Sequence, residues 1–419
     1  MGSHKAKMAF DVAVVGAGAA GQMAAIAAGE EGRRVVLLEQ MDRPGLKILA
    51  SGGGRCNLTN LAPAASFRAA FGRQGRFTAP AMEVMGPGAL RCLFDRLGVP
   101  TIVCDGMCVY PASQRAADVQ AAIRRRIEQL GVTVRLTCAV GKLWIDAGRL
   151  MGVEVAPRDR IAADRVVLAC GGRSWPKLGG TGGGYALARQ AGLAISEPLP
   201  ALVPLVTRQR WPARLAGVSL HDARVRIDSP GEDKSGRTGD ILFTHRGISG
   251  PAVLDISGRV SQLLRWGPVS LRIELVAEMD SSRWVRRLEG WRRSAGRCGV
   301  ANLLQDHLPR SLGAVMCDLA GVKERTSAAH LPAAERDTLA RILGGLELTA
   351  TATEGFEVAF VTRGGVDLKG VARASLQSRT LPGLYLAGEM LDLDGPTGGF
   401  NLQWAFASGW LAGQSATRR

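Results

Sequence analysis

The sequence has few acidic residues for its many basic ones: 53 Lys and Arg against 37 Asp and Glu, a formal net charge of +16. Its eight cysteines include no CxxC pair, so we expect no disulfide framework and a reduced, cytoplasmic protein. The five histidines lack metal-site spacing, and we expect no metal. The longest apolar stretch, 8–29, carries Asp11 and several glycines. We therefore expect no membrane span.

The rest of the composition is that of a globular protein. Of its 419 residues, 46% are hydrophobic and 21% are charged. This length predicts two or three domains, large enough to bury a cofactor. The excess of positive charge points to phosphate-rich ligands or partners, although a GC-rich genome would also favour arginine.

The N-terminal region has the pattern of a dinucleotide-binding fold. A short apolar run at 10–15 leads directly into the turn Gly16-Ala17-Gly18-Ala19-Ala20-Gly21 and an alanine-rich helix. A second apolar run at 35–38 then ends in Glu39, 23 residues after Gly16. Strand, glycine turn, helix, parallel strand and acid therefore occur in the order that this fold requires.

Each residue of this pattern has a physical role. Gly16 makes the tight turn, Gly18 lets the backbone approach a pyrophosphate, and Gly21 permits close packing of helix on strand. The helix N-terminus offers free N–H groups to the phosphates. Glu39 can accept hydrogen bonds from both ribose hydroxyls and disfavours a 2′-phosphate, which favours FAD or NAD over NADP.

The remaining chain alternates between element types. We expect a helix at 117–130, an antiparallel meander at 142–156, alternating β runs at 203–276 and helices at 281–346. A further parallel strand is expected at 132–136, and strands are also expected at 165–169 and 384–387. We find a single nucleotide fold, with glycine segments at 52, 171 and 388 converging on it, and this favours one extended cofactor, FAD.

Three blocks carry a family resemblance: Ser51-Gly52-Gly53-Gly54-Arg55-Cys56-Asn57-Leu58-Thr59-Asn60, Leu242 to Pro251, and Gly383 to Glu389 with Gly398 to Gln403. They look like the BaiN/RdsA family of FAD-binding oxidoreductases, also called aminoacetone-oxidase-like flavoproteins. The resemblance implies an α/β fold, with a split Rossmann-like FAD-binding domain of the glutathione-reductase type. It also implies an inserted antiparallel β-barrel-like domain and a small helical domain. The expected boundaries are 8–195 and 351–415 for the two parts of the FAD-binding domain, 196–280 for the β domain and 281–350 for the helical domain.

The resemblance also implies which residues bind FAD. The glycine turn would hold the pyrophosphate and Val140 would meet the adenine. The turn at Gly399, Phe400 and Asn401 would point backbone N–H groups at the flavin, where charge develops on reduction. The full expected cofactor-binding set is Gly16, Gly18, Ala19, Ala20, Gly21, Glu39, Gln40, Lys47, Ser51, Gly52, Gly53, Asn57, Val140, Gly171, Gly388, Glu389, Gly399, Phe400 and Asn401.

Two residues are candidates for catalysis. Cys56 follows a glycine loop but has no partner cysteine four or five residues on, which argues against a disulfide relay. It is either a small residue packed beside the flavin or a thiol proton donor. His245 follows an apolar run and precedes a turn, so it is either an acid/base group or a histidine that bonds to the backbone at a domain junction.

The positive charge can be localised. Residues 1–195 hold 25 Lys and Arg against 14 Asp and Glu, and no acid occurs between Asp42 and Glu83. This basic 43–76 region should border the flavin and is a possible nucleic-acid surface. A second arginine cluster at 283–297 surrounds Trp284 and Trp291, and we interpret it as tryptophans packed inward and arginines solvated outward.

The resemblance leaves the substrate open. Family members have been assigned reduction of steroid enones, oxidation of aminoacetone, and conversion of a ribosomal RNA uridine to dihydrouridine. We expect an FAD-dependent oxidoreductase with NAD(P)H as a transient hydride donor, and the basic region favours RNA. A small-molecule ene reductase or amine oxidase is the alternative, and a flavin-bearing RNA-binding factor without turnover is a third. The oligomeric state is left open.

Overall fold

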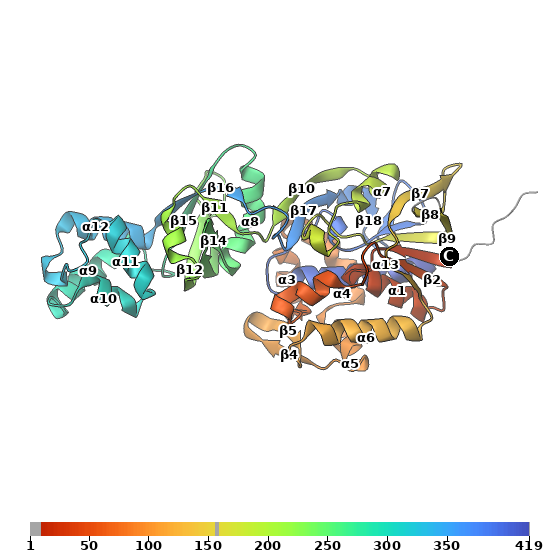
Figure 1. Ribbon diagram of the computed structural model, residues 1–419, viewed down its shortest axis with the longest axis horizontal. Helices are drawn as coiled ribbons and strands as arrows, with labels where there is room; N and C mark the ends of the chain where they lie inside the picture. Colours follow the sequence, from red (N-terminus) through yellow and green to blue (C-terminus); the bar gives the residue numbers. More distant parts are fainter. Residues whose placement is uncertain (1–9, 156–158, 419) are drawn as a thin grey trace, which may run out of the picture. The chain divides into compact units, whose positions relative to one another are not determined.

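The computed structural model describes residues 10–155 and 159–418. Two compact units divide the chain (Figure 1). The first unit combines the chain up to residue 199 with the chain from residue 361 onward, and the second holds residues 200–360. The first unit is thus built from two separate stretches of sequence, in agreement with the expected split domain.

A nine-stranded sheet forms the centre of the first unit. Its path runs in the order β18 (Val371–Ala372), β19 (Gln377–Ser378), β20 (Leu384–Leu386), β9 (Asp159–Leu168), β1 (Phe10–Val15), β2 (Val35–Leu38) and β6 (Thr133–Arg135). Strands β7 (Val140–Asp146) and β8 (Arg149–Val155) form a meander onto β9. The pairs β1–β2, β1–β9, β2–β6 and β9–β20 are parallel. The strands expected from the sequence are therefore confirmed.

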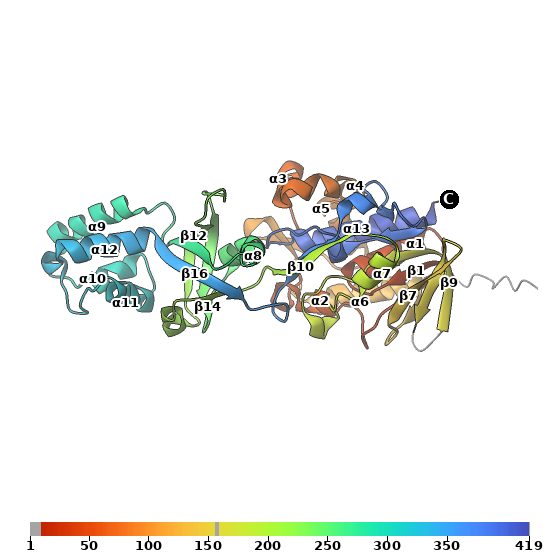
Figure 2. The same ribbon diagram turned by 90° about the horizontal axis from the view of Figure 1, so that it is seen from above.

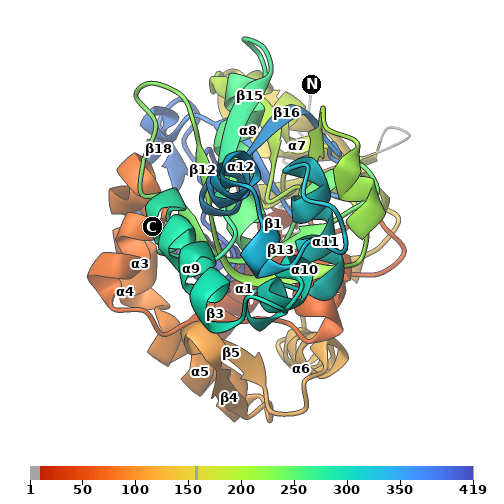
Figure 3. The ribbon, with the colours of Figure 1, turned by 90° about the vertical axis from the view of Figure 1, so that its left-hand side faces the viewer.

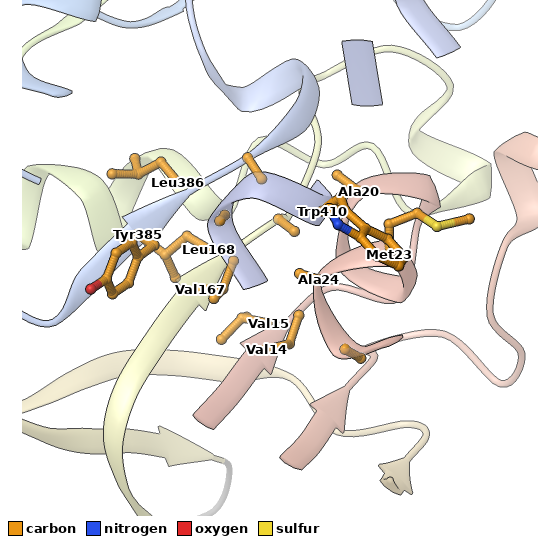
Figure 4. Close-up of a cluster of buried hydrophobic side chains, with 14 of the residues drawn as sticks. Val14, Val15, Ala20, Met23, Ala24, Val167, Leu168, Tyr385, Leu386 and Trp410 are labelled. Atoms are coloured by element: carbon orange, nitrogen blue, oxygen red, sulfur yellow. The ribbon is translucent and has the colours of Figure 1, made fainter. Parts of the chain in front are cut away.

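Two helices, α1 (Ala19–Glu30) and α13 (Phe400–Thr417), pack against each other beside this sheet (Figures 1 and 2). They approach closely because small residues face each other. A Cβ added at Gly409 would collide with the carbonyl oxygen of Ala20, and one at Gly413 with that of Ala24. Figure 4 shows part of the surrounding apolar core, which includes Trp410 of α13.

The first unit also contains further helices and two small sheets. Its helices are α2 (Leu46–Ala50), α3 (Ala64–Ala70), α4 (Ala79–Val84), α5 (Pro87–Arg96), α6 (Ala116–Gln129) and α7 (Gly184–Gln190). A small sheet has the order β3 (Thr59–Asn60), β5 (Cys108–Pro111) and β4 (Thr101–Cys104). Strands β10 (Ile195–Ala201) and β17 (Val361–Val366) form a two-stranded sheet. The helix expected at 117–130 is present as α6.

The second unit contains a closed antiparallel barrel, as the alternating pattern predicted. Its strands follow the order β11 (Leu205–Thr207), β14 (Gly247–Ser249), β13 (Arg237–Phe243), β12 (Ser219–Ile227), β15 (Val269–Glu274) and β16 (Leu346–Thr353), and α8 (Pro251–Leu263) packs on it. Strand β16 is not predicted from the sequence; it follows the helical segment and closes the barrel between β11 and β15.

Between the barrel strands β15 and β16, the described chain forms four α-helices: α9 (Ser281–Ser294), α10 (Val300–Leu303), α11 (Arg310–Leu319) and α12 (Ala333–Gly344) (Figure 3). Trp284, Leu288 and Trp291 on α9 are all buried, as their helical spacing predicted. The boundaries at 196–280 and 281–350 remain predictions. Within the described residues, no helix is both long enough and apolar enough to cross a bilayer.

Candidate FAD site

The turn between β1 and α1 contains three glycines with different surroundings. Gly16 has a φ of +97°, and a Cβ there would lie 2.5 Å from the carbonyl oxygen of Ala169. A Cβ at Gly21 would collide with the carbonyl oxygen of Gly16. Gly18 has an ordinary φ of −75°, and a Cβ there would meet no atom within 4 Å. The fold itself requires Gly16 and Gly21, whereas only a ligand would require Gly18.

The first turn of α1 offers unpaired hydrogen-bond donors. Among the residues that the structure describes, the backbone N–H groups of Gly18, Ala19 and Ala20 have no acceptor, and no side chain caps the helix. Unsatisfied N–H groups and the positive end of the helix dipole attract phosphate. The turn can therefore hold a pyrophosphate.

Glu39 stands at the end of β2 beside this turn and is 9% exposed. Its Oε2 atom accepts a hydrogen bond from the backbone N–H of Ala17 at 2.7 Å, and Oε1 accepts one from Met41 at 2.9 Å. The two donors fix the orientation of the carboxylate. Since each carboxylate oxygen has more than one lone pair, Glu39 can still accept hydrogen bonds from ribose hydroxyls.

A second helix N-terminus lies at the start of α13. Gly398 and Gly399 precede it with φ values of +98° and +94°. The N–H groups of Phe400 and Asn401 have no acceptor within the described part of the chain. The Asn401 side chain is occupied, because its Oδ1 accepts from the N–H of Gly395 and its amide donates to the carbonyl of Gly395, both at 2.8 Å. Asn401 thus shapes the turn with its side chain and offers only its backbone to a ligand.

The glycine loop after α2 is tied to this second N-terminus by Asn57. With its amide oriented to satisfy its neighbours, Asn57 donates to the carbonyl of Thr59 at 3.0 Å and accepts from the N–H of Gly399 at 3.2 Å. Within the loop, Gly52 and Gly53 both have positive φ. The loop and the start of α13 therefore form one continuous piece of structure.

Cys56 lies at the end of this loop and is fully buried. It has a φ of +63°, which is uncommon for a residue with a side chain. Burial raises the pKa of its thiol to about 12, and a hydrogen bond with Ser51 opposes this only in part. A buried, protonated thiol of this kind suits packing better than proton donation.

A polar network that the sequence analysis missed joins four separate segments. Lys47 Nζ donates to Glu389 Oε2 at 2.5 Å and to Ser174 Oγ at 2.6 Å. Ser174 Oγ donates in turn to Glu389 Oε1 at 2.6 Å, and the backbone N–H of Thr362 donates to the same oxygen at 2.9 Å. Ser174 and Thr362 are completely buried. A Cβ at Gly172 would collide with Thr362, so the second of the paired glycines makes room for the network.

This network fixes the orientation of Lys47 and Glu389, two of the residues expected to bind the cofactor. Lys47 is expected along the pyrophosphate and flavin, and Glu389 near the ribityl and phosphate region. Ser174 lies three residues after Gly171, one of the expected cofactor residues, but nothing local in the sequence marks Thr362.

The other expected cofactor residues lie on loops and strand ends of the first unit. Gly388 has a φ of +77°, and its N–H donates to Ser408 Oγ on α13 at 2.9 Å. Gly171 has a φ of +71° and open space around its Cβ position. Gln40 donates from its amide to the carbonyl of Gly179 at 2.8 Å, so its side chain is already engaged. Val140 is the first residue of β7.

His245 belongs to the second unit, whereas the other expected site residues belong to the first. It is exposed in the turn between β13 and β14. No side-chain partner of His245 occurs among the described residues. Its catalytic role stays a prediction.

The first unit has the features that FAD requires. Two helix N-termini present free N–H groups, the backbone at Gly18 is open to a ligand, and Glu39 and Lys47 are held in fixed orientations. Backbone donors suit a pyrophosphate at one end and an anionic flavin ring at the other. The residues present therefore fit this cofactor.

Comparisons with known proteins agree with an FAD-binding protein. The family model described as HI0933-like protein Rossmann domain matches residues 10–415. The chain is 36% identical over 414 residues to the 3-dehydro-bile acid delta(4,6)-reductase of Clostridium scindens, covering 97% of this chain and 99% of that protein. It is 31% identical over 417 residues to the ribosomal RNA dihydrouridine synthase of Escherichia coli, covering 97% of each.

A solved structure, the 3-ketosteroid delta1-dehydrogenase of Sterolibacterium denitrificans in complex with 1,4-androstadiene-3,17-dione, has the same fold. It superposes with a TM-score of 0.56 at 13% identity, covering 97% of this chain and 99% of that one. The match to the family model over nearly the whole chain is the stronger finding, because it is a match in sequence, whereas the likeness to this structure at 13% identity shows the fold alone. The chain belongs to the HI0933-like family and is an FAD-dependent oxidoreductase.

Proposed function

We propose that this protein uses NAD(P)H to reduce a carbon–carbon double bond, and that its substrate is a uridine of ribosomal RNA, which it converts to dihydrouridine. This role would place the protein in the cytoplasm. The relatives support the reaction type, since one is named as a reductase and the other as a dihydrouridine synthase.

The observation that carries the choice of RNA is the basic 43–76 region. Arg55, Arg68, Arg73 and Arg76 are exposed, and none of their side chains has a carboxylate partner within the described residues. Arg43 is paired only with its neighbour Asp42, at 3.5 Å and with both side chains exposed. In the sequence, Arg43 precedes the glycine loop of the candidate FAD site, Arg55 follows its glycines directly, and the other three come 13 to 21 residues later. A small neutral substrate needs no such surface, whereas an RNA strand does.

The reduction adds a hydride to C6 of the uracil ring and a proton to C5. FAD, when bound, supplies the centre that accepts a hydride from NAD(P)H and passes it on. The chain supplies the backbone N–H groups of Phe400 and Asn401 at the N-terminus of α13, which would stabilise negative charge on the flavin. It also supplies the glycine loop that is tied to this turn through Asn57.

Cys56 is not the proton donor in this proposal, because its thiol is buried and its pKa is raised. We expect Cys56→Ala to retain bound flavin and most of its turnover, and its pH–rate profile to match that of the wild type between pH 6 and 9. A positioned acid usually contributes about a hundredfold or more to the rate. If Cys56→Ala lost this much turnover while flavin stayed bound, the thiol would be the proton donor after all.

Mass mapping of large-subunit ribosomal RNA tests the substrate. We expect one dihydrouridine to disappear in a strain without the gene and to return when the wild-type gene is restored. A Gly18→Val variant, in which a bulky side chain projects toward the pyrophosphate position, should fail to restore it. Unchanged dihydrouridine in the deletion strain would rule out this substrate.

A small-molecule ene reductase is the second candidate, and the 36% identity to a bile acid reductase favours it. Anaerobic mixing separates reductases from oxidases: rapid bleaching of the flavin absorbance by NADH or NADPH supports a reductase. Indifference to both nucleotides would favour an amine oxidase.

A further inference from the structure

Helix α9 in the second unit borders a groove of about 570 Å³. The lining residues come from this helix and the segment just before it: Met279, Arg283, Arg286, Arg287, Gly290, Trp291, Arg293 and Ser294. Four of the eight are arginines, and all four are exposed. The groove is therefore strongly basic.

The two faces of α9 are sharply divided. Trp284, Leu288 and Trp291 are buried, and Trp284 packs edge-on against His307 at 5.3 Å between ring centroids. The groove arginines recur three and four residues apart around Gly290, so they form one row on the other side of the helix. Burial and then the charge of Arg287 lower the pKa of His307, so this imidazole adds no positive charge to the helical core at neutral pH.

The charge of this row is not neutralised by nearby acids. Glu289, the one acid of α9, is bound instead by Arg336 of α12, with Nη1 and Oε1 3.1 Å apart. In the described part of the chain, Arg286, Arg287 and Arg293 take part in no ion pair or side-chain hydrogen bond. Elsewhere in the same unit Arg246 and Arg259 are paired with Glu354 and Glu232.

Gly290 lies in the middle of the groove and of the helix. A Cβ at this position would meet no atom within 4 Å, so packing does not require glycine here. Glycine inside a helix is destabilising relative to alanine. Its effect is to leave the backbone uncovered between the arginines, which lets a phosphate come closer than any side chain would allow.

We propose that the α9 groove, defined by Arg283, Arg286, Arg287, Gly290 and Arg293, is a docking surface for the phosphate backbone of a folded RNA. The proposal rests on the proposed function and adds a second contact with the same substrate. Guanidinium groups bind phosphate oxygens through paired hydrogen bonds, and a row of them fits a polyanion. An anionic membrane is a poorer match, because a helix that lies on a bilayer needs a free apolar face and that of α9 is buried.

The test is RNA binding by the full-length holoprotein, measured by fluorescence anisotropy with a labelled transcript of large-subunit ribosomal RNA over a series of KCl concentrations. The groove variant is Arg286→Gln/Arg287→Gln/Arg293→Gln. The matched control, Arg292→Gln/Arg297→Gln/Arg325→Gln, removes the same charge from exposed residues of this helical segment outside the groove. We expect the groove variant to lower the slope of log K against log salt by about 2 and the affinity at least tenfold. The control should change the slope by less than 1.

Flavin content and bleaching by NAD(P)H should be the same in all three proteins, which separates RNA docking from the flavin chemistry. Equal losses of affinity in the groove and control variants, or no loss in the groove variant, would overturn the groove while leaving the proposed function standing. A wild type that binds no RNA would overturn both. Arginine-dependent binding to phosphatidylglycerol vesicles without RNA binding would replace RNA with a lipid surface as the occupant.

Discussion

Helices α13 and α9 are both proposed to bind anionic groups, but by opposite means. Helix α13 contains no charged residue, is buried along most of its length, and offers backbone N–H groups at its first turn. Helix α9 carries five arginines in fourteen residues and buries only three side chains. The proposed ligand of α13 is a cofactor that must be held in one position, and fixed backbone N–H groups suit it. The proposed ligand of α9 is a mobile polymer, and solvated arginine side chains suit it. Changes in α13 should therefore disturb the fold and the cofactor, whereas changes to the exposed arginines of α9 should affect only the binding of a partner.

The largest effect is expected from Gly409→Ala. Its Cβ would collide with the carbonyl oxygen of Ala20 on α1, and neither backbone can move without disturbing the core. We expect a loss of about 3 kcal/mol in the free energy of unfolding, the upper end for overpacking, together with loss of FAD. Urea unfolding followed by circular dichroism, with flavin fluorescence as a second signal, measures both. A stability within 0.5 kcal/mol of the wild type, the range of a neutral surface change, would show that the two helices can separate freely.

The second effect is expected from Lys47→Met, which keeps the length of the side chain and removes its charge. Glu389 would lose its cation, and Ser174 would lose a donor. Because both charged side chains are partly exposed, at 31% and 19%, we expect only about 1–2 kcal/mol of lost stability. FAD affinity should fall about tenfold, as one charge-assisted contact predicts.

Equilibrium dialysis of FAD and thermal unfolding test this prediction. Lys177→Met is the matched control, since Lys177 is exposed and forms no ion pair within the described residues. Equal effects of the two variants would mean that net charge, and not the network, determines affinity.

The network also shows where prediction from sequence stops. The strands, the glycine turn and Glu39 were predictable because each is encoded by a short local pattern of apolar residues, glycines and one acid. The contacts of Ser174 were not, because its partners Thr362 and Glu389 lie 188 and 215 residues further along the chain and meet it only in the folded protein. The closing barrel strand β16 was missed for the same reason, since its partners β11 and β15 precede it by a long helical insertion.

Burial is the other quantity that local patterns did not give. Cys56 follows a glycine loop in the sequence and could equally be a reactive thiol or a packed residue. The structure places it at zero exposure, with a raised thiol pKa. Side-chain engagement was equally hidden, since Asn401 and Gln40 both use their amides to bind backbone groups of their own chain.

Substitutions at Gly18 and Gly21 should distinguish a glycine that a ligand requires from one that the fold requires. Gly18→Ala should leave the stability of the apoprotein unchanged, because its φ of −75° suits alanine and its Cβ meets no protein atom. FAD affinity should fall about tenfold, equivalent to 1.4 kcal/mol, since the methyl group projects toward the pyrophosphate. Gly21→Ala is the contrasting variant and should destabilise the protein even without FAD. If Gly18→Ala bound FAD with the affinity of the wild type, the pyrophosphate would not bind at this turn.

The smallest effect, and one of opposite sign, is expected from Gly290→Ala in α9. The same substitution that disrupts α13 at Gly409 should here stabilise the protein by about 0.5–1 kcal/mol, because the new methyl group meets no atom and the helix gains in propensity. The same methyl group should weaken RNA binding in the α9 groove, because it covers the backbone between Arg286 and Arg293. Urea unfolding should therefore show a gain in stability while the affinity for ribosomal RNA falls a few-fold. A gain in stability with unchanged affinity would mean that RNA contacts the arginines alone, and a loss of stability would contradict the open surroundings of Gly290.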